Sequence, residues 1–195
     1  MYRKVFKRLV DILLSLLALP VLLIFLVIVG PIIHFTDGGP IFFNGDRLGY
    51  HGKIFKMYKF RSMRVNAPDI RNEDGSTFNS NEDFRVTKIG KFIRKTSIDE
   101  IPQIINILKG DMSIIGPRPG LPENWNDLSE DEKKRRSVRP GITGYSQAYF
   151  RNSDTMEERM QNDIEYTNNI TFLNDCKIFF KTISSVLTKK NINRN

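Results

Sequence analysis

The sequence predicts an α+β protein, mainly helical, in which an N-terminal membrane segment precedes a compact domain. Residues 12–36 carry no formal charge, and an apolar run of this length is typical of a membrane segment. Two short strand patterns follow, at residues 40–46 and 53–60, and glycines between them indicate a β-hairpin. Helical periods dominate the rest of the chain. We therefore expect two units, a membrane segment over residues 1–36 and a compact domain over residues 37–195.

The apolar run is flanked by basic residues on both sides, so the positive-inside rule does not choose an orientation. Pro20 lies near its middle, where a proline removes a helix hydrogen bond and clashes with the preceding turn. Ser15, a little more than one turn earlier, could bond the freed backbone groups. Two structures stay open: a span with a weakly set orientation, and a re-entrant helix-break-helix that leaves both flanks on one side. We favour the second. No small-x-small cleavage site follows, so we expect the segment to be retained.

The composition narrows the function classes. The formal net charge of +8 favours an anionic partner, such as phospholipid headgroups, phosphorylated substrates or nucleic acid. Cys176 is the one cysteine, which excludes an internal disulfide and fits a reducing compartment. His34 and His51 are the only histidines, which argues against a Ser-His-Asp arrangement and against a zinc site. The sequence also contains no phosphate-binding Gly-x-x-x-x-Gly-Lys-Ser/Thr loop.

The first half of the domain combines the hairpin with two helical patterns. The second strand pattern, residues 53–60, interleaves aromatic and basic side chains. Residues 66–84 are polar without an apolar period, so we expect a loop. A basic amphipathic helix is predicted over residues 86–95. A second helical stripe ends at Gly110, and its apolar members are Ile101, Ile104, Ile105 and Leu108.

The second half contains further loops and helices. Residues 116–122 are too rich in proline and glycine for regular structure. The capping-box pattern Ser129-x-x-Glu132 predicts the start of a short helix. Residues 139–147 are turn-rich and lead into a candidate strand, and residues 154–167 read as a helix. The last helix, over residues 172–190, is amphipathic and basic. It either lies on an anionic membrane surface or packs on the domain core.

Asp99 and Glu100 form the candidate catalytic pair. Because proline is tolerated in a helix only in the first turn, Pro102 places both acids at or near a helix N-terminus. The backbone N–H groups and the helix dipole there are expected to lower the pKa of Asp99 and keep it ionised, as a nucleophile or a metal ligand requires. The alternative is a structural role, because Ser97-x-x-Glu100 is also a capping-box pattern.

Basic residues surround this acidic pair in the sequence. Arg94 lies five residues before Asp99, and Lys59 and Arg61 end the second strand pattern. Arg118 stands between two prolines, which stiffen the backbone that holds it; a structural proline-rich turn is the alternative. A carboxylate among several such cations suits a diphosphate substrate.

Five motifs are specific in combination. They are Lys59-Phe-Arg-Ser-Met63, Thr87-Lys-Ile-Gly-Lys-Phe-Ile-Arg94, Ser97-Ile-Asp-Glu-Ile-Pro-Gln103, Lys109-Gly-Asp-Met-Ser-Ile-Ile-Gly-Pro-Arg-Pro119 and Arg139-Pro-Gly-Ile-Thr-Gly144. Together they resemble the bacterial sugar transferases called monotopic phosphoglycosyl transferases, over essentially the full chain. With one hydrophobic segment, the sequence resembles the small single-domain members, and we do not expect the extra transmembrane helices of the larger ones.

The resemblance implies transfer of a phospho-sugar from a UDP-sugar to undecaprenyl or another polyprenol phosphate, with release of UMP. This is the first membrane step of glycoconjugate biosynthesis, for a polysaccharide or for protein glycosylation. By the resemblance, Asp99 forms a covalent aspartyl phospho-sugar, and Glu100 assists by ordering a metal or handling a proton. Mg²⁺ near Asp99 is expected to offset the diphosphate charge. The phosphate-binding residues that it implies are Lys59, Arg61, Arg94 and Arg118.

The resemblance also supports the re-entrant hairpin, with both flanks in the cytosol at the bacterial inner membrane. It implies membrane lipids and downstream glycosyltransferases as partners, and no nucleic acid. One stretch departs from the pattern: many relatives carry Trp near Tyr145 and a small residue near Phe150. The sugar identity therefore stays open, with Gln147 and Arg151 as candidate contacts. The competing hypothesis is a basic membrane-anchored module that binds lipid headgroups or nucleic acid without catalysis.

Overall fold

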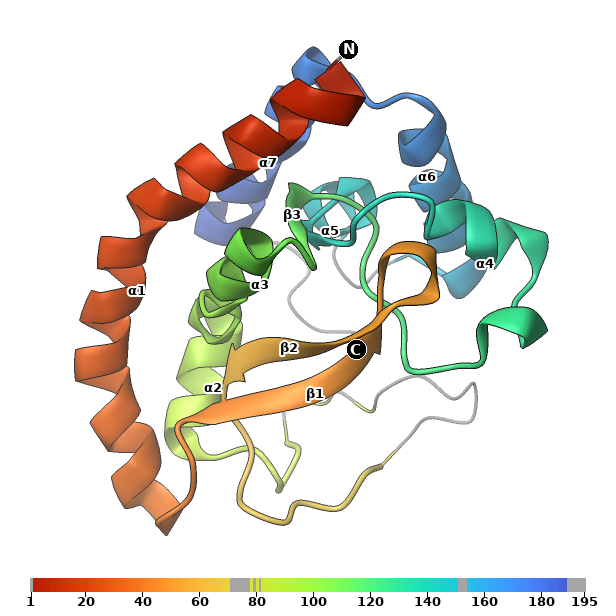
Figure 1. Cartoon of the computed structure of the whole chain (residues 1–195). Coiled ribbons are helices and arrows are strands. Elements are labelled where there is room, and N and C mark those ends of the chain that lie inside the picture. Colours follow the sequence, from red (N-terminus) through yellow and green to blue (C-terminus); the bar gives the residue numbers. More distant parts are fainter. Residues whose placement is uncertain (1, 71–77, 79, 81, 151–153, 189–195) are drawn as a thin grey trace.

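A computed structural model of the chain describes residues 2–70, 78, 80, 82–150 and 154–188 (Figure 1). Over these residues the fold is mainly helical with two small two-stranded sheets, which confirms the predicted α+β class. The helices are α1 (Lys7–Asp37), α2 (Lys88–Lys95), α3 (Gln103–Lys109), α4 (Glu130–Arg135), α5 (Tyr145–Tyr149), α6 (Met156–Asn168) and α7 (Phe172–Thr188). The strands are β1 (Phe42–Leu48), β2 (Ile54–Phe60), β3 (Ser113–Ile115) and β4 (Gly141–Thr143).

α1 runs along one side of the domain over its whole length (Figure 1). Its buried residues recur at helical spacing and form one stripe that faces the domain; they are Asp11, Ser15, Leu22, Val29, Gly30 and Ile33. Leu22, Val29 and Ile33 pack with Phe60 of β2 and Ile93 of α2 in the largest apolar cluster. The predicted membrane segment is therefore packed into the core of the domain and does not form the separate unit that was expected.

The opposite face of α1 is apolar and exposed. Leu17, Val27 and Phe35 on this face are 67%, 74% and 84% accessible. α1 is the one helix in the described part of the chain that is long and apolar enough to cross a membrane. Its 31 residues span about 46 Å, which exceeds the hydrocarbon thickness of about 30 Å. An exposed apolar face of this extent indicates contact with lipid.

The helix break predicted at Pro20 is not seen. α1 continues through both Pro20 and Pro31 and bows outward from the domain between its ends (Figure 1). Leu19 and Leu22 pack on the domain core on either side of Pro20, and this packing holds the helix together where one backbone hydrogen bond is lost. The role expected for Ser15 is not seen either, because its buried hydroxyl has no hydrogen-bond partner among the described residues.

β1 and β2 form the predicted hairpin, antiparallel with Phe42 opposite Phe60. Asn106 of α3, completely buried, ties this hairpin to the helices. Its side-chain oxygen accepts from the N–H of Tyr58 at 2.9 Å, and its side-chain nitrogen donates to the carbonyl of Lys56 at 2.7 Å. Both bonds use backbone groups of β2, so α3 and β2 are held in a fixed register.

The second sheet consists of β3 and β4 in parallel, with Ser113 opposite Gly141. The strand expected to follow the turn-rich residues 139–147 is not seen: β4 lies inside that stretch, and α5 (Tyr145–Tyr149) follows it. β3 was not predicted, since three residues are too few to show an alternating pattern. The last helix was expected either to lie on a membrane surface or to pack on the domain core, and α7 packs on the core. Ile178 is fully buried, while Leu173 and Phe180 are exposed on another face of the same helix.

Candidate active site

Asp99 and Glu100 lie in a 3₁₀ turn, Ile98–Glu100, between α2 and α3. Pro102 is the cap residue of α3, so the predicted position just before a helix is confirmed. The capping-box interpretation is wrong. Ser97 adopts a left-handed conformation with φ of 58°, and its side chain makes no capping hydrogen bond. A serine in this backbone region cannot present its oxygen to the first turn as a capping residue does.

Glu100 is held by basic side chains instead. The Nζ of Lys59, near the end of β2, lies 2.7 Å from Oε1 of Glu100. The guanidinium of Arg118 approaches the same oxygen at 3.8 Å. Lys59 and Glu100 are both largely buried, so this ion pair is screened little by solvent and fixes the end of β2 against the 3₁₀ turn.

Asp99 is buried, with 8% of its surface accessible. Burial raises the pKa of Asp99 to about 6, and the charge of Glu100 raises it as well, while Lys59, Arg94 and Arg118 lower it. The sequence-based expectation of a lowered pKa for Asp99 is therefore wrong, because removal from water outweighs the neighbouring cations. The carboxylate is still ionised in most molecules at neutral pH. A buried carboxylate with a raised pKa, close to three cations, is typical of a functional site.

Arg94, in the last turn of α2, donates from Nε to the hydroxyl of Ser62 at 2.8 Å. No ion pair joins Arg94 to a carboxylate in the described part of the chain, although Asp99 is close enough to interact with its charge. Arg94 is thus held in place while its terminal nitrogens keep their capacity to bind an anion.

The loop that carries Arg118 is fixed at both ends. The N–H of Gly116 donates to the carbonyl of Thr143 at 2.9 Å, and Leu48 and Gly120 exchange backbone hydrogen bonds of 3.0 and 3.2 Å. The guanidinium of Arg135 donates to the carbonyl of Arg118 itself at 3.2 Å. The half-exposed side chain of Arg118 therefore projects from a rigid backbone, as its proline neighbours suggested.

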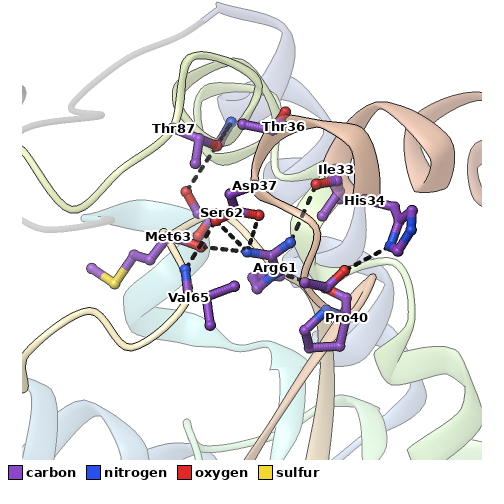
Figure 2. Close-up of polar contacts among 12 residues, drawn as sticks. Ile33, His34, Thr36, Asp37, Pro40, Arg61, Ser62, Met63, Val65 and Thr87 are labelled. Atoms are coloured by element: carbon purple, nitrogen blue, oxygen red, sulfur yellow. Dashed lines mark hydrogen bonds and ion pairs between the residues drawn. The ribbon is translucent and has the colours of Figure 1, made fainter.

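Arg61 does not line this site, contrary to the prediction. Its guanidinium is buried and donates to Asp37 at 2.7 Å and to the carbonyls of Pro40 and Ile33 at 2.6 and 3.2 Å (Figure 2). It thereby binds the C-terminal end of α1. The physical reason is that β2 ends at Phe60, so the alternation that would place Arg61 on the same face as Lys59 does not continue.

Gln147 and Arg151 were candidate contacts for the sugar or the base. Gln147 lies in α5, where both of its side-chain amide atoms are buried without a hydrogen-bond partner among the described residues. Its Oε1 lies next to Gly144, as does the carbonyl oxygen of Gly116, so Gln147 is near the start of the loop that carries Arg118. A role in binding stays a prediction for Gln147, and Arg151 lies outside the described residues.

Three residues were missed from the sequence, two that hold the site (Asn106 and Ser62) and one that holds Arg61 away from it (Asp37). Asn106 interrupts an apolar helical stripe with a polar side chain, and this signal could have found it. Asp37 is the first charged residue after the apolar run, which marks it only as a boundary. Ser62 carries no signal in the sequence beyond its place in a motif.

The carboxylates of the site differ in their fitness to bind Mg²⁺. No cluster of three or more His, Cys, Asp or Glu side chains among the described residues is placed to hold a metal. Mg²⁺ is commonly held by one or two carboxylates together with substrate phosphates and water. Asp99 fits this donor set, whereas Glu100 already binds Lys59.

Comparison with known proteins decides the family. The model of the family described as "Bacterial sugar transferase" matches residues 2–189. The chain belongs to this family. Two relatives are the galactosyl transferase CpsE of Streptococcus agalactiae, 44% identical over 93% of this chain, and the uncharacterized sugar transferase EpsL of Bacillus subtilis, 37% identical over 96%. A third is the UDP-glucose:undecaprenyl-phosphate glucose-1-phosphate transferase of Klebsiella pneumoniae, 40% identical over 92%.

The relatives of this bacterial sugar transferase differ in length. The chain spans 90% of EpsL but only 42% of CpsE and 39% of the Klebsiella enzyme. The matched part in the longer relatives is therefore a fraction of the whole protein. In this chain, the residues that the family model matches include α1 and every residue of the candidate active site.

Proposed function

We propose that this chain transfers a phospho-sugar from a UDP-sugar to undecaprenyl phosphate, or a related polyprenol phosphate, and releases UMP. The observation that supports it best is the buried carboxylate of Asp99, which interacts electrostatically with Lys59, Arg94 and Arg118. This arrangement offers a nucleophile and three cations to a diphosphate. The names of related proteins, which include a glucose-1-phosphate transferase acting on undecaprenyl phosphate, support the same reaction.

In the first step an oxygen of Asp99 attacks the phosphorus atom that bears the sugar. A bond forms between that oxygen and phosphorus, and the bond from phosphorus to the bridging oxygen breaks, so that UMP leaves. Burial raises the pKa of Asp99 to about 6, which makes the carboxylate basic while it remains ionised at neutral pH. Arg94 and Arg118 bind the phosphate oxygens, where charge builds up.

In the second step an oxygen of the lipid phosphate attacks the same phosphorus atom. The aspartyl bond breaks, a lipid diphosphate sugar forms, and the carboxylate of Asp99 is regenerated. Glu100 holds Lys59 at 2.7 Å and so positions a cation beside the reacting phosphate. The product is lipid-linked, and a glycosyltransferase that extends such sugars is the expected downstream partner.

Mg²⁺ is part of this proposal. Asp99 is the residue that would hold the ion, together with the diphosphate, and the ion would offset the negative charge of the phosphates. The residues of the chain perform the remaining tasks: Lys59, Arg94 and Arg118 bind and orient, and the burial of Asp99 limits access of water.

The topology that we propose is monotopic, with the domain on the cytosolic face of the inner membrane, where UDP-sugars and the lipid phosphate meet. α1 packs along the domain from Asp11 to Ile33. If α1 crossed the bilayer, the charged domain packed against it would have to enter the hydrocarbon, at a high energetic cost. If α1 instead lies along one surface, with its exposed apolar face in the lipid and both ends at that surface, this cost is avoided.

The test is release of UMP by the purified protein in detergent or in lipid discs. Undecaprenyl phosphate, Mg²⁺ and a panel of UDP-sugars are supplied, and the Asp99→Asn variant is the control. We expect UMP from at least one sugar, dependent on the lipid phosphate and absent in the variant. Mass spectrometry of the wild type without the lipid phosphate should find a phospho-sugar on Asp99.

Two results would contradict the proposal. A folded wild-type protein that releases no UMP from any UDP-sugar would favour a module that binds without catalysis. Release of UMP by Asp99→Asn at more than a few percent of the wild-type rate would remove Asp99 as the nucleophile.

A further inference from the structure

Within the described residues, the side chain of Arg94 makes one hydrogen bond, from Nε to the hydroxyl of Ser62 at 2.8 Å. A guanidinium is planar and carries five donors in a fixed geometry. When Nε is bound, the plane of the guanidinium is set, and the four N–H groups of the terminal nitrogens have no partner in the part of the chain that the structure describes. The charge of Arg94 interacts with that of Asp99, so the guanidinium lies near the proposed nucleophile.

Ser62 is itself held firmly. Its carbonyl accepts from the N–H of Thr87 at 3.0 Å and from the Thr87 hydroxyl at 3.4 Å (Figure 2). Arg61, the preceding residue, is buried against the end of α1. The hydroxyl of Ser62 therefore projects from a backbone that is fixed on both sides. It offers Arg94 a hydrogen-bond acceptor in a fixed position.

The close approach of α2 to Ser62 depends on a glycine. A Cβ atom at Gly90 would overlap the carbonyl oxygen of Ser62. Gly90 and Arg94 are four residues apart, so they lie on the same face of α2. The backbone of α2 thus rests directly on Ser62, and Arg94, one turn later, reaches its hydroxyl from the same face.

We propose that Ser62 is a positioning residue for the substrate diphosphate. Its hydroxyl holds the guanidinium of Arg94 with both terminal nitrogens turned toward a phosphate beside Asp99. The inference rests on the proposed function, because it deepens the role of Arg94 in that reaction. A bidentate contact between guanidinium and phosphate needs this orientation, and an arginine that rotates freely would have to be ordered at each binding event.

The experiment compares Ser62→Ala, Ser62→Thr, Arg94→Lys and the double variant Ser62→Ala/Arg94→Lys. The kcat and KM for the UDP-sugar are measured with undecaprenyl phosphate, along with the melting temperature. Ser185→Ala is the matched control, since its hydroxyl donates to the carbonyl of Ala148 in α5 at 2.6 Å and makes, within the described residues, no hydrogen bond to Asp99, Glu100, Lys59, Arg94 or Arg118. It removes a hydrogen bond of similar length.

We expect Ser62→Ala to lower kcat/KM about tenfold or more, mainly through a higher KM, because a hydrogen bond to a charged group is lost. Ser62→Thr keeps the hydroxyl and should recover most of this loss. Lysine has no Nε–H to donate in the same way, so in the Arg94→Lys background Ser62→Ala should cause little further loss.

Two results would overturn the inference while the wild type is active. One is a loss from Ser62→Ala that is equally large in the Arg94→Lys background. The other is a lower melting temperature with unchanged KM, which would mean that Ser62 only fastens α2 to the segment after β2. A wild type that releases no UMP would instead overturn the proposed function, and this inference with it.

Discussion

The ammonium nitrogen of Lys59 lies 2.7 Å from a carboxylate oxygen of Glu100, the residue next to the proposed nucleophile Asp99. The two charges act on Asp99 in opposite directions, since Lys59 lowers its pKa and Glu100 raises it. The pair thus holds a cation and an anion at fixed positions beside one buried carboxylate, and the reactivity of that carboxylate should respond to each.

The first prediction concerns the pH dependence of activity. The nucleophile must be ionised, and burial raises the pKa of Asp99 to about 6. UMP release should therefore be full above about pH 7 and should fall as the pH drops through about 6. The measurement is kcat/KM against pH with a saturating lipid phosphate. A profile that stays flat down to about pH 5 would contradict the raised pKa.

The second prediction uses the Lys59–Glu100 pair. Glu100→Gln removes a negative charge beside Asp99 and should shift the acid limb of the pH profile to lower pH. Lys59→Gln removes a positive charge and should shift that limb to higher pH. Each variant needs only enough residual activity to record a pH profile, because the test compares the pH at which activity falls and not the maximal rate. Shifts in the same direction would mean that structural changes dominate over charge.

The third prediction concerns stability. The folded-state pKa of Asp99, about 6, lies above its ordinary value of 3.8. The contribution of Asp99 to the free energy of unfolding is therefore largest below about pH 4, where the carboxyl is protonated in both states. This contribution is lost as the pH rises through 6, because the buried group must then ionise. At pH 7.5 ionised Asp99 therefore costs at most about 3 kcal/mol. Asp99→Asn should melt at or above the wild-type temperature at pH 7.5, and the difference should shrink near pH 4.5.

A less stable Asp99→Asn protein at pH 7.5 would contradict this account. It would mean that the charge of Asp99 anchors the surrounding cations in the fold. Glu100→Gln is the useful comparison. Loss of the Glu100 carboxylate breaks a short ion pair with Lys59 and should lower the melting temperature.

The sequence predicted the elements that have a clear local pattern. The hairpin, α2 and α3 follow from alternation, helical period and the terminating Gly110, which adopts φ of 90° at the end of α3. β3 could not be predicted, because its structure depends on pairing with a strand 28 residues later and not on its own pattern.

The candidate site shows the same division. The motifs brought Asp99, Glu100, Arg94 and Arg118 together correctly, and the position of Pro102 placed the acids before a helix. The pKa of Asp99 was predicted with the wrong sign, because helix-terminus effects can be read from neighbours in the sequence while burial cannot. Arg61 was misplaced for a similar reason: its partner Asp37 lies 24 residues away.

The fourth prediction distinguishes Arg61 from Arg118, both of which were expected from the sequence to bind phosphate. Arg61→Ala removes a buried guanidinium and leaves Asp37 and two backbone carbonyls without their donor, so it should destabilise the protein by about 3 to 5 kcal/mol. Arg118→Ala removes a half-exposed side chain and should change the melting temperature little, while raising the KM for the UDP-sugar about tenfold or more. Thermal unfolding and steady-state kinetics on both variants test the distinction. A stable Arg61→Ala protein with a raised KM would instead mean that Arg61 binds the substrate in the active site.

The last prediction concerns topology. Near the N-terminal end of α1, Arg8 donates to the carbonyls of Ile107 and Leu108 at 2.7 and 3.3 Å. Near its C-terminal end, Asp37 pairs with Arg61 at 2.6 Å. Both ends are bound to one domain, so both should stay on the same side of the membrane.

To test this, single cysteines replace the exposed residues Arg3 and Asn44 in a Cys176→Ser background, and cells are treated with a membrane-impermeant maleimide. Neither cysteine should react in intact cells, and both should react after the membrane is opened. Reaction of one of the two from outside would mean that α1 crosses the bilayer. The contacts of Arg8 and Asp37 could then not exist in the same molecule, because the domain cannot lie on both sides of the hydrocarbon at once. Labelling of both cysteines only after the membrane is opened would therefore support both the one-sided topology and the packing of α1 along the domain.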